Sequence, residues 1–112
     1  AAKPTKIFTH SHEDLHPDHR AVHRITLDLL MLANIKPEVY MYSVWNPVSL
    51  RTDYPALYVD THTTFFKKLK ALRLFRSQQI HISYPVFLLI FHNLRNGLRI
   101  RSWCAEQFFR IL

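Results

Sequence analysis

Glycine is almost absent from this chain, because its 112 residues contain only Gly97. A complete α/β enzyme uses more glycine than this in the turns between its strands and helices. The chain begins Ala-Ala-Lys-Pro-Thr-Lys and so also lacks an initiator methionine. Both features lead us to expect a piece of a longer protein.

Cysteine and long apolar runs are also scarce. Cys104 has no second cysteine with which to form an internal disulfide, which fits a reducing compartment. The first residues have no apolar signal core, and the longest apolar run, residues 85–91, is too short to cross a bilayer. We therefore expect a soluble, cytoplasmic chain without a membrane span.

Acidic residues are outnumbered, with 8 Asp and Glu against 15 Lys and Arg, which gives a net charge of +7. This balance favours anionic partners such as nucleic acid, phosphorylated ligands or acidic lipid surfaces. An acidic segment elsewhere in the full protein could equally offset it. The apolar content of 48% is enough for one modest core, so residues 1–112 are expected to form a single domain.

Hydrophobic spacing predicts alternating elements along the chain. The expected strands are residues 6–9, 39–45 and 56–60. The expected helices are residues 17–34, 65–79 and 84–96, the last closed by Gly97. The tail from residue 102 to 112 fits a helix or a strand. This order indicates part of a layered α/β fold, in which ligands gather where strands end and helices begin.

One such junction is rich in chemistry. Residues 9–20 contain four histidines and three carboxylates, at the end of the first strand and the start of the first helix. Imidazole and carboxylate groups bind metals and carry protons near neutral pH. If Pro17 opens the helix, His16 is its N-cap and Asp18 and His19 lie in the first turn. One histidine could then bind a metal while a neighbour transfers a proton or stabilises an oxyanion.

A catalytic zinc site needs three protein ligands, and one short loop supplies them only awkwardly. Ligands from another segment or another chain are therefore expected. For His10, His12 and His23 we favour loop or surface positions, and for Glu13 and Asp14 a role at the helix N-terminus.

The segment His16-Pro17-Asp18-His19-Arg20-Ala21-Val22-His23, preceded by Glu13-Asp14, resembles the second metal motif of the LmbE-like (PIG-L) N-acetylglucosaminyl deacetylases. Residues 39–42 resemble the strand that follows in that family. Residues 58–61, 67–68, 71–72 and 77–78 resemble its "VDI…K…AL…SQ" segment, and residues 105–108 resemble its closing "AExF" stretch. The resemblance covers nearly the whole chain in the correct order.

The resemblance implies a fold and a chemistry. The fold would be the C-terminal portion of a Rossmann-like three-layer α/β sandwich. Family members hold zinc with a His and an Asp of an N-terminal "HPDD" motif and the last His of "HPDH", and they remove the N-acetyl group from GlcNAc-type sugars. His19 would then be the third zinc ligand, His16 would stabilise the oxyanion or protonate the leaving amine, and Asp18 would orient His16. Because this chain has no "HPDD" motif, we expect it to be inactive alone and to need a missing N-terminal half or another chain.

Two other classes remain open. The chain could be a non-catalytic basic binding module that keeps the fold, or, on charge alone, a nucleic-acid binder. We consider nucleic acid unlikely as a partner. The basic residues of the helix at 67–76 fit a solvent-exposed helix face better than a nucleic-acid recognition helix. The apolar residues 84–91 could bury against the missing half or form a homo-oligomer contact.

Overall fold

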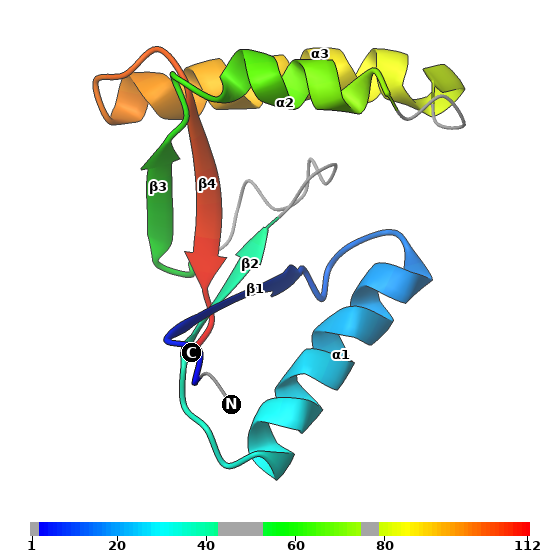
Figure 1. The fold of residues 1–112 in the computed structure, drawn as a ribbon, viewed down its shortest axis with the longest axis vertical. Coiled ribbons are helices and arrows are strands. Elements are labelled where there is room, and N and C mark those ends of the chain that lie inside the picture. The colour runs from blue at the N-terminus through cyan, green and yellow to red at the C-terminus, as the bar shows by residue number, and fades with distance from the viewer. Residues whose placement is uncertain (1–2, 43–52, 75–78) are drawn as a thin grey trace. The chain divides into compact units, whose positions relative to one another are not determined.

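The computed structural model describes residues 3–42, 53–74 and 79–112 (Figure 1). Four strands are present there, namely β1 (Lys6–His10), β2 (Glu38–Tyr42), β3 (Ala56–Asp60) and β4 (Ala105–Arg110). Three helices accompany them, namely α1 (Pro17–Leu32), α2 (Phe65–Leu72) and α3 (Gln79–Arg99). The fold is a small mixed α/β structure, as the sequence predicts.

The four strands form one mixed sheet in the order β1-β2-β4-β3. Strand β1 runs parallel to β2, which pairs antiparallel with β4. Lys6 is the register partner of Glu38, whose carboxylate also pairs with Arg110 at 3.2 Å. The side chain of Lys6 holds the pKa of Glu38 below its usual value. Opposite charges on neighbouring strands thus favour the observed register.

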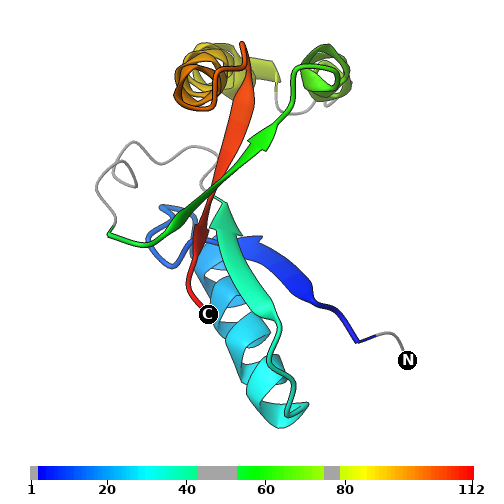
Figure 2. The same ribbon diagram turned by 90° about the vertical axis from the view of Figure 1, so that its left-hand side faces the viewer.

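The chain divides into two compact units. Unit 1 comprises residues 1–57 and 108–112, and unit 2 comprises residues 58–107. Unit 1 buries Val39, Tyr40, Met41 and Phe109 from its strands, together with Leu30 from α1. Unit 2 buries Phe65, Leu89, Cys104 and Ala105. Its two helices lie side by side, as the end-on view in Figure 2 shows.

Helix α1 begins and ends where the sequence predicts. The ring of His16 caps its start by accepting the backbone N–H of Asp18 at 3.2 Å, and Pro17 occupies the first position. At the other end Asn34 adopts a left-handed conformation, with φ of 49°. Its N–H donates to the Met31 carbonyl, and the N–H of Ile35 donates to the Leu30 carbonyl. These two bonds form a Schellman motif, which ends the helix.

Two predicted helix boundaries are wrong. The helix expected over residues 65–79 ends at Leu72, with Arg73 as its C-cap, although no Gly or Pro marks that break. The helix expected from residue 84 begins at Gln79, so Pro85 lies inside it and not near its start. The strand predicted over residues 39–45 is confirmed for residues 39–42, which belong to β2, and residues 43–45 lie outside the described ones. The ambiguous tail contains strand β4.

Gly97 does not close α3, contrary to the prediction. The helix continues to Arg99, and Arg101 takes the left-handed position with φ of 58°. The N–H of Ser102 donates to the Gly97 carbonyl at 2.9 Å, which completes a Schellman motif. Gly97 is needed for a different reason: a Cβ there would lie 2.6 Å from the carbonyl carbon of Trp103 and closer still to the backbone nitrogen of Cys104. Its missing side chain lets β4 begin directly against α3.

We expect Gly97→Ala to destabilise the chain by about 2 kcal/mol or more, because the new methyl group overlaps backbone atoms that cannot rotate away. This cost exceeds the roughly 1 kcal/mol that alanine gains over glycine inside a helix. Urea unfolding of the two proteins measures the difference. Leu98→Ala, at the exposed neighbouring position, is the control and should change stability by less than about 0.5 kcal/mol. Equal effects of the two substitutions would contradict this account.

None of the described helices combines the length and the apolar composition that a membrane span requires.

Candidate metal site

Three potential metal ligands meet beyond the carboxyl end of β1. His10 is the last residue of that strand, Asp14 lies in the following loop, and His19 is in the first turn of α1. One ligand atom from each residue lies within 4.8 Å of the others. In the described part of the chain this is the group of His, Cys, Asp or Glu side chains that could hold a metal ion.

The loop itself places Asp14. The N–H of Asp14 donates to the Ser11 carbonyl at 3.3 Å, which turns the chain back toward the helix. The carboxylate of Asp14 then accepts the N–H of His16 at 2.9 Å, just before α1 begins. Asp14 is buried, and its second oxygen lies 3.0 Å from Nδ1 of His19. The turn and the helix start thus bring a carboxylate and an imidazole together.

The two histidines of the group have unsatisfied nitrogens. Nδ1 of His10 and Nδ1 of His19 are buried and have no hydrogen-bond partner in the described structure. Although His19 Nδ1 lies at ion-pair distance from Asp14, the approach does not have hydrogen-bond geometry. We therefore regard this contact as electrostatic. Buried polar atoms without partners are uncommon and call for an explanation, and a bound cation is one.

The charge states suit a cation. Burial opposes ionisation of Asp14, but the backbone N–H of His16 and the ring of His19 outweigh it, so the pKa of Asp14 lies below its ordinary value. Burial lowers the pKa of His10, and the nearby ring of His19 lowers it further. At neutral pH Asp14 is therefore ionised and His10 is neutral. These are the protonation states in which carboxylate and imidazole bind metals.

The fit to one metal ion is good for two of the three side chains. Two ligands of a four-coordinate zinc ion lie about 3.3 Å apart, close to the 3.0 Å between Asp14 and His19. The rings of His10 and His19 are stacked, with centroids 3.9 Å apart and planes 9° apart. Because a metal lies near the plane of each imidazole that binds it, two stacked rings cannot share one ion. His10 would have to rotate before it joined the other two.

The predicted site residues fall around this group. His19 is in it, whereas His16 and Asp18 lie beside it at the helix start, with largely exposed side chains. The ring of His16 lies 4.9 Å from that of His19, centroid to centroid. The carboxylate of Asp18 is 3.8 Å from His16 Nδ1, which already accepts the backbone N–H of Asp18. The structure thus gathers all three residues at one helix end, and their roles stay predictions.

Sequence reasoning missed His10 and Asp14. Both were assigned to loop or capping roles, yet both belong to the group, and Asp14 also serves the helix start as expected. His23 is buried and does not lie on the surface. Its Nδ1 bonds the His10 carbonyl at 2.9 Å, and this bond connects α1 to the end of β1. The position of His10 at the strand end, four residues before an aspartate, was the available signal.

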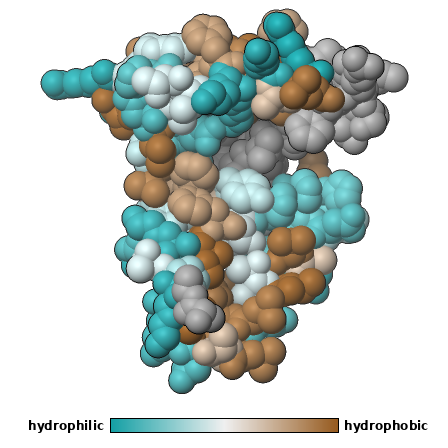
Figure 3. Space-filling model, in the orientation of Figure 1, coloured by the Kyte–Doolittle hydropathy of each residue, from teal (hydrophilic) through white to brown (hydrophobic). Residues whose placement is uncertain are grey.

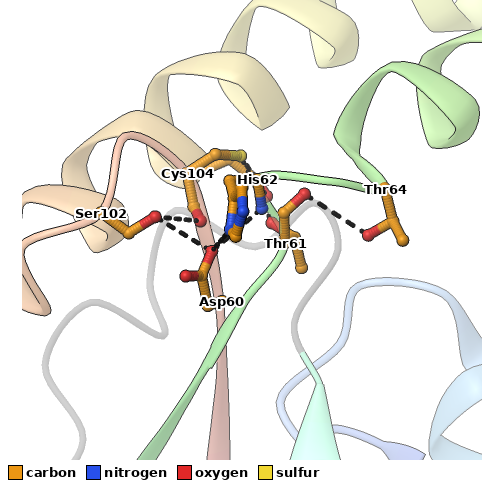
Figure 4. A network of polar contacts seen from close by, with 7 residues as sticks. Asp60, Thr61, His62, Thr64, Ser102 and Cys104 are labelled. Carbon is orange, nitrogen blue, oxygen red and sulfur yellow. Dashed lines mark hydrogen bonds and ion pairs between the residues drawn. The ribbon is translucent and has the colours of Figure 1, made fainter.

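A second polar network lies in unit 2, at the carboxyl end of β3 (Figure 4). One oxygen of Asp60 accepts the backbone N–H of His62 at 3.0 Å, the ring Nδ1 of His62 at 2.9 Å and the Ser102 hydroxyl at 2.9 Å. Thr61 follows β3 directly, and its N–H donates to the carbonyl of Cys104, the residue before β4, at 3.1 Å. The Thr61 hydroxyl also bonds the sulfur of Cys104 at 3.3 Å. Since Ser102 bonds the carboxylate and not the imidazole, the cluster is not a nucleophilic triad. It ties the α3–β4 loop to β3.

This network predicts a pH dependence. The backbone N–H and ring of His62 lower the pKa of Asp60 from 3.8, so the ionised form stabilises the fold. That stabilisation is present above pH 3.8 and is lost as the pH falls through the lower folded-state value. We expect Asp60→Asn to lower the urea midpoint at pH 7 and to match the parent chain once the pH lies well below the folded-state pKa of Asp60. Asp28→Asn, on the exposed side of α1, is the control; a pH-independent difference for Asp60→Asn would contradict the assignment.

Comparison with known proteins gives one fold relative. No protein-family model and no curated protein matches the chain. The crystal structure of GalB, the 4-carboxy-2-hydroxymuconate hydratase from Pseudomonas putida KT2440, matches with a TM-score of 0.77 at 16% identity. The match covers 98% of this chain and 53% of GalB, so the chain spans about half the length of that protein. At this identity the likeness shows that the chain shares a fold with part of GalB.

Proposed function

We propose that the chain is the C-terminal part of a zinc-dependent hydrolase of the LmbE-like (PIG-L) family, which removes the N-acetyl group from a GlcNAc-type sugar or conjugate. The observation that carries the proposal is the meeting of Asp14 and His19 beside His10, with two buried ring nitrogens that have no hydrogen-bond partner. The fold shared with GalB supports the family, and the order of the motifs supports the chemistry.

Asp14 and His19 would hold the metal, with His10 joining them after a rotation of its ring. Zinc in such a site acts as a Lewis acid that polarises a carbonyl and makes water more acidic. Asp14, ionised at neutral pH, supplies the negative charge that holds the cation. Its bond to the His16 N–H would also hold the carboxylate in position beside His19.

His16 would act on the acetamide itself. Because its Nδ1 accepts the Asp18 N–H, the neutral ring carries its proton on Nε2. The neutral ring can donate a hydrogen bond from Nε2 to a developing oxyanion. To protonate the leaving amine, the ring would first have to gain a second proton on Nδ1, which would replace the bond from the Asp18 N–H. The backbone of Asp18 therefore orients His16 directly, and its carboxylate at 3.8 Å would stabilise the imidazolium that forms during proton transfer.

The remaining ligands and the general base would come from outside this chain. Strand β1, which ends at the site, is at the edge of the sheet. Helix α1 packs on β1, yet Val22, Ile25, Leu29 and Leu32 on the helix are exposed. Figure 3 shows this hydrophobic surface along α1. A further strand beside β1, from the same protein or another chain, would cover those residues and bring new side chains to the carboxyl end of β1.

The complete protein tests the proposal. Purified with and without chelator, it is assayed for bound zinc and for acetate released from N-acetylglucosamine and its glycosides. We expect one zinc ion per protein and release of acetate that chelation abolishes. A complete protein that binds zinc but releases no acetate from any of these sugars would refute the deacetylase assignment, and one that binds no zinc would refute the metal site.

The alternative is a non-catalytic basic module that has kept the fold. The stacked rings of His10 and His19 favour it, since that arrangement leaves only two side chains placed for a metal ion. Absence of bound metal at every pH at which histidine is neutral would support this module. A binding constant for polynucleotide that falls steeply with added salt would instead support the nucleic-acid class.

A further inference from the structure

In its described part, helix α3 buries two asparagines and exposes a row of large apolar residues. The buried side of the helix carries Leu89, Asn93, Asn96 and Gly97. Phe87, Phe91, Leu94 and Leu98 have exposed fractions of 75%, 59%, 41% and 77%. Successive residues turn by about 100° around a helix, so these four side chains form one stripe opposite the buried side. We call them the α3 stripe.

A helix that only covers its own core shows the reverse distribution. Here the inward asparagines have tasks within unit 2, because Asn93 bonds the Leu89 carbonyl at 2.9 Å and contacts the sulfur of Cys104. The α3 stripe has no such task in the described structure. Each of its four residues is more than two-fifths exposed to solvent, and together they extend over three turns of the helix. Exposed phenylalanine and leucine in this arrangement mark a contact surface.

Unit 2, which carries the stripe, is cationic. Residues 61–105 contain eight Lys and Arg and not a single Asp or Glu. Lys67 and Lys70 on α2 are exposed, as are Arg99 and Arg101 at the end of α3. Apart from Asp60, Glu106 is the acidic residue of unit 2, and Lys68 pairs with it. The positive electrostatic potential of unit 2 therefore attracts an anionic partner and repels a second copy of unit 2.

We propose that unit 2 docks on an anionic lipid surface, with the α3 stripe inserted among the acyl chains and the lysines and arginines at the headgroups. An interfacial helix has this composition, with Phe and Leu on one side and basic residues beside them. Helix α3 is about 30 Å long at 1.5 Å per residue, so it can lie along the bilayer plane.

Lipid suits the stripe better than a protein or a nucleic acid. Protein partners anchor aromatic residues in pockets and usually meet a mixture of apolar and hydrogen-bonding groups. The α3 stripe instead offers four projecting hydrocarbon side chains in a row, which a fluid acyl layer accepts without a matched shape. Nucleic acid would be held by the cations, but it offers nothing that would bury the two leucines.

Vesicle flotation of the complete protein tests this surface. We expect binding to phosphatidylcholine vesicles with about 30% phosphatidylserine, little binding to phosphatidylcholine alone, and release as the salt concentration rises. Leu98→Gln should lower the partition coefficient about tenfold or more, since burial of one leucine is worth roughly that factor. Met31→Gln is the matched control, because Met31 on α1 is 76% exposed and should change binding less than twofold.

Several results would overturn the proposal. These are no binding to the anionic vesicles, equal binding to neutral ones, and equal effects of Leu98→Gln and Met31→Gln. If Leu98→Gln dissociates an oligomer in light scattering and leaves vesicle binding unchanged, the stripe contacts a second copy. If Leu98→Gln lowers binding of an acidic protein or polynucleotide but not of vesicles, the partner is not lipid. Metal binding at unit 1 plays no part in these measurements.

Discussion

His19→Ala is expected to lower the zinc affinity of the complete protein by more than about 100-fold and to reduce acetate release to background. Loss of an outer-shell partner of a metal ligand already costs 10- to 100-fold in affinity, and a ligand itself costs more. Asp14 would lose the imidazole that lies 3.0 Å away and helps to keep its pKa low. Zinc titration against a fluorescent chelator measures the affinity, and acetate release measures the activity.

The matched control for this experiment is His62→Ala. His62 also has its ring close to an aspartate carboxylate, but it lies just after β3 in unit 2. We expect it to leave zinc affinity and acetate release within about twofold of the parent protein. If His19→Ala binds zinc as tightly as His62→Ala does, His19 is not a ligand and the proposed metal site is wrong.

His16→Ala is expected to separate chemistry from metal binding. The variant should retain its zinc and lose about 10²- to 10⁴-fold in kcat, which is the usual contribution of a general acid or base. KM should change little, because the lost interaction forms in the transition state. The alanine also removes the helix cap, at about 1 kcal/mol of stability, so the assay is run well below the melting temperature.

Asn at position 16 provides the control for capping, because His16→Asn can still accept the Asp18 N–H but cannot carry a proton near neutral pH. We expect its stability to be close to the parent's and its kcat to be as low as that of His16→Ala. Recovery of kcat in His16→Asn would show that His16 acts through the helix start and not through proton transfer. Asp18→Asn should lower kcat less than either, since the backbone N–H that His16 accepts remains.

Much of the secondary structure could be predicted because its signals are local. Pro17 and the residues around Asn34 predicted the limits of α1, and β-branched and aromatic residues predicted β2 and β3. The break after Leu72 could not be predicted, because residues 73–79 are compatible with a helix and contain no Gly or Pro. The role of Gly97 was also predicted wrongly, because nothing local in the sequence shows what packs against it. A helix-ending glycine and a glycine that admits a crossing strand look identical in sequence.

The candidate site was predicted in location but not in composition. Imidazoles and carboxylates crowded between a strand and a helix predicted a site there, and His19 is part of it. Asp14 and His10 precede His19 by five and nine residues in the sequence. They reach His19 only because the turn at Ser11 folds the loop back toward the helix. Sequence spacing in a loop carries no such information, because loop residues have no fixed period.

By itself the sequence determined the alternation of strands and helices, the position of the His-rich junction and the excess of positive charge, since each follows from residues close together in the chain. Tertiary structure alone decided that Asp14 and His10 meet His19, that Gly97 makes room for β4, and that the apolar side of α3 faces outward. The physical reason is that each of these depends on the path of the backbone in space, which decides what lies opposite a given side chain, and the spacing of residues along the chain does not specify that path.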